Sequence, residues 1–538
     1  MMGTGSLHGV QTTFLLLLVM VASFAAMARR LRVPYPILLV IAGLGISFVP
    51  HVPRFPLDPQ LVFLIFLPPL LYASAWQTSW REFRRNLVSI ALLALGLVGF
   101  TVWGVAEVAD RFITALDWKS GFILGAVVAT TDAIAASSIA SAVGLPRQVV
   151  DVLEGESLVN DATGLLALEF GLTMLLRGET PTPLQGTLRL LWLMGGGLGV
   201  GLLVGVITAW FERWIDDGPV ELVISLIVPY AAYLAGEGIR ASGVLAVVAC
   251  GLYMSWKSVA LFSPEVRLQL LSAWSGLNFM LNGMVFVLIG LQLPYVLAGI
   301  RGEYSRWTLL EYGAVFSAVL IALRLLWIFP GAEMAYQIRT RLLGQRYDRP
   351  PARAVFVVGW TGMRGVVALA AAISLPEVLG SGRPFAQRDL IVFLTFCVIL
   401  VTLVVQGLSL PALIRWLGLA GSGEDRGAER KARQTVLQAA VSYLEQSQER
   451  DGEAFAHEYE DLLHFYRDRL QAITASADGG ADERTPATEE QRRRIGVGAV
   501  QAERRELIRM RDGGEIGDEL LREMERELDL TEARQRTR

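Results

Sequence analysis

Apolar segments long enough to cross a lipid bilayer recur from the N-terminus to about Leu419, and they restrict the possible fold more than any other feature. In hydrocarbon every backbone amide needs a partner inside the protein, so helices of about 20 apolar residues are the expected spanning elements. Of the 538 residues, 53% are hydrophobic and 18% are charged, which is too apolar for a soluble chain of this length. The sequence therefore predicts an all-α polytopic membrane protein.

About thirteen segments meet this criterion. Their approximate limits are 8–28, 34–50, 61–77, 86–110, 120–143, 148–176, 188–211, 218–238, 242–256, 266–298, 307–336, 353–375 and 389–416. One set of alternate loops is richer in arginine and lysine, which predicts an N-terminus outside and a C-terminus in the cytosol. Because charged residues dominate after Gly421, we expect a transmembrane domain over 1–419 and a helical cytosolic tail over 420–538.

The sixth predicted span contains the run Glu154-Gly-Glu-Ser-Leu-Val-Asn-Asp161, with three carboxylates and an amide. A charge at the bilayer centre costs roughly 2.5 kcal/mol or more, so such residues are candidates for function. On a helix Ser157 and Asp161 share one face, and Glu156 and Asn160 share the adjoining face. One row could bind a cation and the other a structural partner.

The fifth predicted span contains adjacent threonines followed by Asp132. Such residues favour local hydrogen bonds over helix continuation, which predicts a break from Thr130 to Asp132. Free carbonyls at this depth are tolerated where they line a cavity, and there they can coordinate a cation. The alternative is an unbroken helix rich in serine and threonine that packs closely on its neighbours.

The twelfth predicted span contains three glycines around Arg364, between Gly359 and Val367, which predicts a second interrupted helix. Paired interruptions in separate halves of a chain indicate inverted repeats that meet at a binding site. A buried guanidinium needs a carboxylate, and we expect Glu156, with Asn160 beside it, to be the partner of Arg364.

Three motifs together resemble the sodium/proton exchanger type of the monovalent cation:proton antiporters. They are the Thr131-Asp132 pair, the Glu156-Ser-Leu-Val-Asn-Asp161 run and the Gly-Met-Arg364-Gly segment. The stretches 66–72, 80–84 and 513–530 resemble the bacterial branch of that family.

This resemblance implies thirteen helices, inverted six-helix repeats, a homodimer and elevator-like alternating access. It also implies the site residues. Asp161 would carry the ion and the proton, with Asp132, the Thr131 backbone and Ser157 near the cation, and with Asn160, Glu156 and Arg364 as the supporting network. Some relatives have an acidic residue on the third span, where this chain offers only Tyr72 and Ser74.

Exchange chemistry is compatible with these residue types. None of the four histidines lies in a predicted helix core, so the proton carrier is expected to be a carboxylate. A hard cation such as Na⁺ prefers oxygen ligands. Competition between Na⁺ and a proton for Asp161 predicts antiport, and Asn160 before it, with no lysine nearby, favours electroneutral one-for-one exchange.

Other functions stay open at this point. Li⁺ or K⁺ could replace Na⁺, a K⁺/H⁺ antiporter is the alternative within the class, and a cation channel would also bury carboxylates. An enzyme is not expected, because no nucleophile is paired with a base. We expect no cofactor and no nucleic-acid partner, and a location in the bacterial inner membrane, where exchange would serve pH and sodium homeostasis.

Two further features are less directly tied to transport. Arg324 lies in the eleventh predicted span, where it could snorkel or pair across a dimer, and we expect no catalytic role for it. In the tail, 424–474 and 491–530 are predicted to be helical. The apolar positions of the first stretch are expected to be Val436, Ala439, Ala440, Tyr443 and Leu444, and its two histidines, His457 and His464, are expected at the surface.

Overall fold

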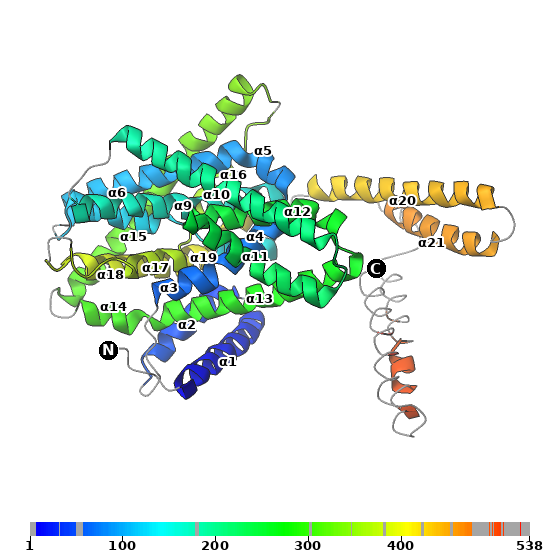
Figure 1. Cartoon of the computed structure of the whole chain (residues 1–538), viewed down its shortest axis with the longest axis horizontal. Coiled ribbons are helices and arrows are strands. Elements are labelled where there is room, and N and C mark those ends of the chain that lie inside the picture. The colour runs from blue at the N-terminus through cyan, green and yellow to red at the C-terminus, as the bar shows by residue number, and fades with distance from the viewer. Residues whose placement is uncertain are drawn as a thin grey trace. The chain divides into compact units, whose positions relative to one another are not determined.

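The computed structural model describes residues 7–420 apart from 32, 50–57, 114, 178–181, 301–303, 346 and 380–382. Beyond them it describes 424–451, 456–475, 494, 498, 500–506, 509–510, 524 and 528. The chain divides into two compact units, Met1–Ser422 and Gly423–Arg538. Within the described residues the first unit is helical and contains no sheet (Figure 1).

The helices of the first half correspond to the predicted spans one to six. They are α1 (Leu7–Leu31), α2 (Tyr35–Ser47), α3 (Pro59–Leu61) with the π-helical turn η1 (Val62–Phe66) and α4 (Leu67–Gln77), α5 (Trp80–Ala91) with η2 (Leu92–Leu97) and α6 (Val98–Phe112), α7 (Trp118–Ala129) with α8 (Ala133–Val143), and α9 (Arg147–Arg177).

The remaining predicted spans are formed in the same way. They are α10 (Pro183–Glu212), α11 (Gly218–Gly238), α12 (Gly243–Leu261), α13 (Pro264–Leu291) with α14 (Leu293–Gly299), α15 (Arg306–Gln337) with η3 (Ile338–Leu342), α16 (Ala352–Trp360) with α17 (Val366–Ile373), and α18 (Arg388–Val401) with η4 (Thr402–Gln406) and α19 (Gly407–Trp416). Among the described residues, 10 helices have the length and composition of a membrane span, and two shorter apolar helices, Tyr35–Ser47 and Gly243–Ser258, match two further predictions. The remaining prediction corresponds to the broken pair α16 and α17, so the polytopic all-α fold is confirmed.

Both predicted interruptions are present. α7 ends at Ala129, where Thr130 turns to extended backbone, and α8 begins at Ala133. α16 ends at Trp360, and Gly365 leads in extended conformation into α17. The breaks fall in the fifth and twelfth spans, and the six spans between them give the two broken helices opposite directions through the bundle. This arrangement is that of inverted repeats.

The two breaks meet at their backbones. The Asp132 amide donates a hydrogen bond of 2.8 Å to the carbonyl of Met363. Neither group belongs to a regular helix, so each satisfies an otherwise unpaired backbone atom of the other. The contact holds the two helix breaks against one another in the protein interior.

Buried side chains form two large apolar cores that meet at α9. The first includes residues of α2, α7, α13 and α15 to α19, and it takes Leu153 and Leu168 from α9. The second includes residues of α4 and α10 to α13, and it takes Leu158 and Ala162 from the same helix. α9 therefore lies between two packed groups of helices, and its polar residues lie where those groups meet.

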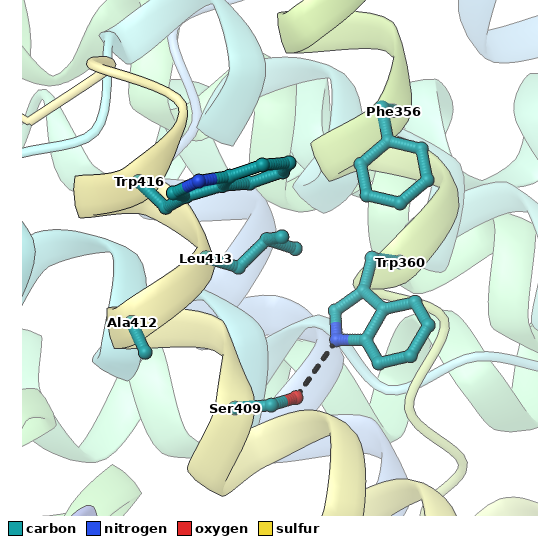
Figure 2. A pocket seen from close by; sticks show the side chains of 6 residues that line it. All are labelled: Phe356, Trp360, Ser409, Ala412, Leu413 and Trp416. Atoms are coloured by element: carbon teal, nitrogen blue, oxygen red, sulfur yellow. Dashed lines mark hydrogen bonds between the residues drawn. The ribbon is translucent and has the colours of Figure 1, made fainter.

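An apolar pocket lies beside the end of α16 (Figure 2). It has a volume of about 340 Å³ and is lined by Phe356, Trp360, Ser409, Ala412, Leu413 and Trp416. Its one hydrogen bond between lining side chains runs from Trp360 Nε1 to Ser409 Oγ over 3.0 Å. The six lining residues include no acidic or basic side chain.

The second unit, by itself, contains the helical hairpin α20 (Glu424–Asp451) and α21 (Ala456–Ala475). Val441 and Leu444 pack against Leu463, and Arg467 pairs with Glu445 at 2.6 Å. The predicted apolar positions were largely wrong, because Val436, Ala439 and Tyr443 are exposed and the buried stripe is Leu437, Val441 and Leu444. His464 is exposed and lies beside Asp468. Most of the predicted helix 491–530 lies outside the described residues.

Candidate cation-binding site

Helix α9 carries the acidic run deep in the protein. Glu156 and Asn160 are each 1% exposed and Asp161 is 5% exposed. Their burial follows from the small and apolar residues that surround them on the helix, since Gly155 lies against Ile90 of α5 and Gly164 lies against Thr130. A carboxylate at such depth requires a partner cation, a proton or hydrogen-bond donors.

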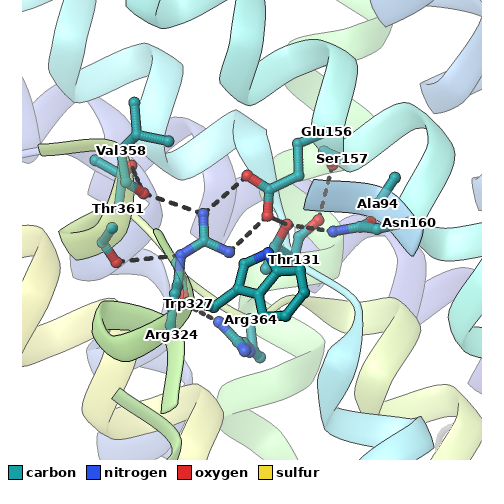
Figure 3. A network of polar contacts seen from close by, with 12 residues as sticks. Ala94, Thr131, Glu156, Ser157, Asn160, Arg324, Trp327, Val358, Thr361 and Arg364 are labelled. Atoms are coloured by element: carbon teal, nitrogen blue, oxygen red, sulfur yellow. Dashed lines mark hydrogen bonds and ion pairs between the residues drawn. The ribbon is translucent and has the colours of Figure 1, made fainter. Parts of the chain in front are cut away.

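Thr131, in the first break, joins three of the predicted residues on α9 (Figure 3). Asn160 Nδ2 donates to Thr131 Oγ1 over 2.5 Å, and that hydroxyl donates to Glu156 Oε1 over 3.3 Å. Ser157 Oγ donates to the Thr131 carbonyl over 2.8 Å. Both predicted rows of α9 therefore contact the break, and the irregular backbone is held by side chains of its neighbour.

The ion-pair partner of Glu156 is Arg324 of α15. Arg324 Nη1 lies 2.5 Å from Oε1 and Nη2 lies 2.8 Å from Oε2, a bidentate pair with both side chains almost fully buried. The expected pairing of Glu156 with Arg364 was wrong, and Arg324 neither snorkels nor needs a second subunit for its charge. Its planar fork matches the carboxylate, which is the geometry that guanidinium groups favour.

Arg324 also closes the end of a broken helix. Its Nε donates to the Gly359 carbonyl and its Nη2 to the Val358 carbonyl, each over 3.1 Å. The last carbonyls of α16 have no partner within that helix, and they carry the negative end of its dipole. One buried arginine thus neutralises Glu156 and satisfies the interruption of the twelfth span.

Arg364 performs the corresponding task on the other break. Its Nε donates to the Val128 carbonyl at the end of α7 over 2.8 Å, and its Nη1 donates to the Gly362 carbonyl. Its backbone amide donates to Thr402 Oγ1 over 3.2 Å. The carbonyls at the end of α16 therefore accept from Arg324, and that of Val128 at the end of α7 accepts from Arg364, which belongs to the second break.

Asp132 and Asp161 form no ion pair with an arginine among the described residues. Asp132 Oδ1 accepts from the Ile134 amide over 2.8 Å and so caps the start of α8. Asp161 lies close enough to Asp132 for their charges to interact. Among the described residues, neither a hydrogen bond nor an ion pair accompanies the Asp161 carboxylate.

Three further polar side chains, Asn160, Thr163 and Trp327, lie at or near the site. Asn160 Oδ1 is buried without a hydrogen-bond partner in the part of the chain that the structure describes. Thr163 Oγ1 donates to the Ala94 carbonyl over 2.6 Å, and Trp327 Nε1 donates to the Leu92 carbonyl over 3.3 Å. Both carbonyls belong to the π-helical turn η2, so these side chains satisfy groups that the widened turn releases. Sequence reasoning missed Thr163 and Trp327, because nothing in the sequence marked the π turn.

The structure therefore brings Thr131, Glu156, Ser157 and Asn160 together, places Asp132 and Asp161 beside them, and puts Arg364 on the facing break. It also adds Arg324, which sequence reasoning had set aside. The signal was available, because a buried carboxylate needs a cation and Arg324 stands alone in a long apolar run.

The chain resembles known transporters over most of its length. The family model for the transmembrane sodium/hydrogen exchanger matches residues 15–416. A protein of Mycobacterium tuberculosis that is named as an uncharacterized Na⁺/H⁺ exchanger is 34% identical over 96% of this chain and 95% of its own length. The sodium, potassium, lithium and rubidium/H⁺ antiporter of Bacillus subtilis is 30% identical over 93% of this chain and 74% of its own length.

A solved structure has the same fold. The sodium proton antiporter MjNhaP1 of Methanocaldococcus jannaschii superposes with a TM-score of 0.60 and 22% identity, over 76% of this chain and 98% of that one. At this identity the similarity concerns the fold alone. Its polytopic helical architecture agrees with the spans and breaks described above. The family to which these matches belong consists of antiporters and not of enzymes, and the chain is a member of the sodium/hydrogen exchanger family.

Proposed function

We propose that this protein exchanges Na⁺ for H⁺ and that Asp161 carries both by turns. The observation that carries the proposal is a buried carboxylate, Asp161, that has no partner among the described residues and lies next to Asp132 and to a broken helix. Protonation would release the cation, and cation binding would expel the proton. Thr131 and Ser157 supply oxygen atoms at the break, and Asp132 adds a second negative charge.

The supporting network leaves one charge to be neutralised. Glu156, Asp132 and Asp161 carry three negative charges, while Arg324 and Arg364 carry two positive charges. A buried group of charges is most stable when its net charge is small. One Na⁺ or one proton would complete the balance, and this supports electroneutral one-for-one exchange.

The choice among alkali ions depends on the size of the site, because all of them accept oxygen ligands. We take Na⁺ as the main cation and Li⁺ and K⁺ as additional ones. The relative from Bacillus subtilis, which is named for sodium, potassium, lithium and rubidium, supports a broad selectivity. A K⁺/H⁺ antiporter is the second candidate for the same reason.

We further propose a homodimer in the bacterial inner membrane, with the N-terminus outside and the charged tail in the cytosol, serving pH and sodium homeostasis. Helix α10 presents exposed apolar residues, including Leu191, Leu198 and Leu202, which suit contact with lipid or with a second copy. The excess of arginine in one set of loops supports the orientation.

The direct test is exchange by the purified full-length protein in proteoliposomes. An outward gradient of Na⁺, Li⁺ or K⁺ is imposed in turn, and the internal pH is followed with a trapped dye. The proposal expects a fall in internal pH with Na⁺ and none with choline. Cation flux without any coupled proton movement would instead indicate a channel.

A further inference from the structure

A second pair of carboxylates is buried away from the transport site. Glu212 is the last residue of α10 and is 2% exposed, and Glu221 lies in the first turn of α11 and is 1% exposed. The two are close enough for their charges to interact. They lie among the helices of the second apolar core, not on the breaks.

In the described part of the chain, one oxygen of each carboxylate lies buried without a hydrogen-bond donor. Glu212 Oε2 and Glu221 Oε2 are both buried without a hydrogen-bond partner among the described residues. Within the same part of the chain, no arginine or lysine forms an ion pair with either group. Two like charges placed together in an apolar core are strongly unfavourable, so a positive charge must be shared between them.

Among the described residues, the other titratable groups whose charges interact with the pair are acidic ones. Tyr72 of α4 and Cys250 of α12 lie within electrostatic range of Glu212, and Asp216 and Asp217 of the connecting loop lie within range of Glu221. Tyr72 Oη is itself buried and has no partner among the described residues. Asp217 caps α11 by accepting from the Val220 amide over 3.3 Å, so its carboxylate is already used.

Helix dipoles make the two carboxylates unequal. Glu221 stands at the N-terminus of α11, where the partial positive charge of the helix favours a carboxylate. Glu212 stands at the C-terminus of α10, where a negative charge is disfavoured and a cation is favoured. The positive charge is therefore needed most at Glu212.

A polar pocket lies beside the loop that joins α10 to α11. It has a volume of about 380 Å³ and is lined by Asp216, Gly218, Ser263, Pro264, Glu265, Val266 and Gln269. Val266 also belongs to the second apolar core, which connects the pocket wall to the packing around Tyr72. The acidic residues at the pocket, Asp216 and Glu265, attract cations to it.

We propose that Glu212 and Glu221 form a second cation site, which takes one proton or one alkali ion and is separate from the transport site at Asp161. The site suits a single positive charge. No group of three His, Cys, Asp or Glu side chains able to hold a metal ion occurs in the described residues. Occupancy stabilises the packing of α10 on α11, and loss of the cation leaves two adjacent negative charges there.

The test measures stability, so it does not depend on transport. The full-length chain carries Asp132→Asn and Asp161→Asn to remove the ion dependence of the transport site. Its thermal midpoint is measured over a pH series, in choline chloride and in NaCl, KCl or LiCl of equal ionic strength. Because the folded state holds the proton more tightly than the unfolded chain, stability in choline is expected to fall as the pH rises.

Two variants in this background identify the carboxylates. Glu212→Gln and Glu221→Gln each remove one of the two charges, so each is expected to reduce the decrease of the thermal midpoint with rising pH by several degrees. Glu311→Gln, at an exposed carboxylate of α15, is the matched control and is expected to show the same decrease of the thermal midpoint with pH as the parent. If alkali chloride restores the midpoint at high pH in the parent, the site takes an alkali ion. If choline and alkali chloride give the same curve, the site takes a proton.

A second measurement covers the case in which the glutamine variants do not fold. Dicyclohexylcarbodiimide, an apolar reagent that adds to protonated carboxyl groups, is applied to the unmodified protein, and labelled peptides are identified by mass spectrometry. Labelling at Glu212 or Glu221 at low pH, which decreases at high pH or with alkali ion, is expected. Equal dependence of all variants on pH and ions, or absence of label at both residues at every pH, would overturn the proposal.

Discussion

At the scale of single residues, the ion pair between Glu156 and Arg324 determines how the site is organised. Both side chains lie in predicted spans, but the sequence analysis chose Arg364 as the partner of Glu156 and gave Arg324 no role at the site. That choice depends on how α15 packs against α9 and α16, and no local pattern encodes it. By contrast, the contacts of Thr131 with α9 follow from the helical spacing of Glu156 and Asn160 and were within reach of sequence reasoning.

The pairing predicts a particular pattern of stability. Glu156→Gln or Arg324→Gln alone leaves one buried charge unpaired and is expected to destabilise the protein by roughly 3–5 kcal/mol. The double variant is expected to lose much less than the sum, which a double-mutant cycle on denaturation in detergent measures. Glu156→Gln with Arg364→Gln is the matched control. A larger coupling for that control pair than for Glu156 with Arg324 would contradict the assignment.

At the scale of elements, the two interruptions are what the sequence predicted best. Adjacent threonines before Asp132 and glycines around Arg364 marked both breaks, because these residues satisfy or release backbone groups in known ways. The π-helical turns could not be predicted, since their residues are ordinary apolar ones such as Leu92 to Leu97. In the tail the helices α20 and α21 were predicted, but the buried stripe was misplaced, because the apolar Val436 and Tyr443 lie on the exposed face of α20.

The first break gives a prediction that separates charge from structure. In Asp132→Asn the side-chain oxygen can still accept from the Ile134 amide, so folding is expected to be normal while the apparent affinity for Na⁺ falls at least about tenfold. Asp132→Ala loses the cap as well, and is expected to cost about 1 kcal/mol more in stability. Transport kinetics and thermal midpoints of the two variants check this. Equal stability of both would show that the cap contributes nothing.

At the scale of the whole molecule, the count and order of the spans came from hydrophobic length alone, because a helix must cover the bilayer. The grouping of the helices into two apolar cores could not be predicted in this way, since the two cores contain the same residue types.

The balance of buried charges at the site predicts that transport carries no net charge. Valinomycin with a K⁺ gradient imposes a membrane potential on proteoliposomes, and the rate of Na⁺/H⁺ exchange is expected to equal the rate measured under the same K⁺ gradient without valinomycin. Acceleration by the potential alone would mean that the number of protons exchanged for each Na⁺ differs from one, so that each cycle moves net charge.

The most direct test of the central proposal is made on Asp161, in proteoliposomes that contain either Asp161→Asn or the control Glu311→Gln. Both proteins are checked for equal reconstitution and thermal stability, and proton movement driven by a Na⁺ gradient is then recorded. We expect exchange to be lost in Asp161→Asn and kept in Glu311→Gln. Exchange by a well-folded Asp161→Asn protein would mean that another group carries the ion and the proton.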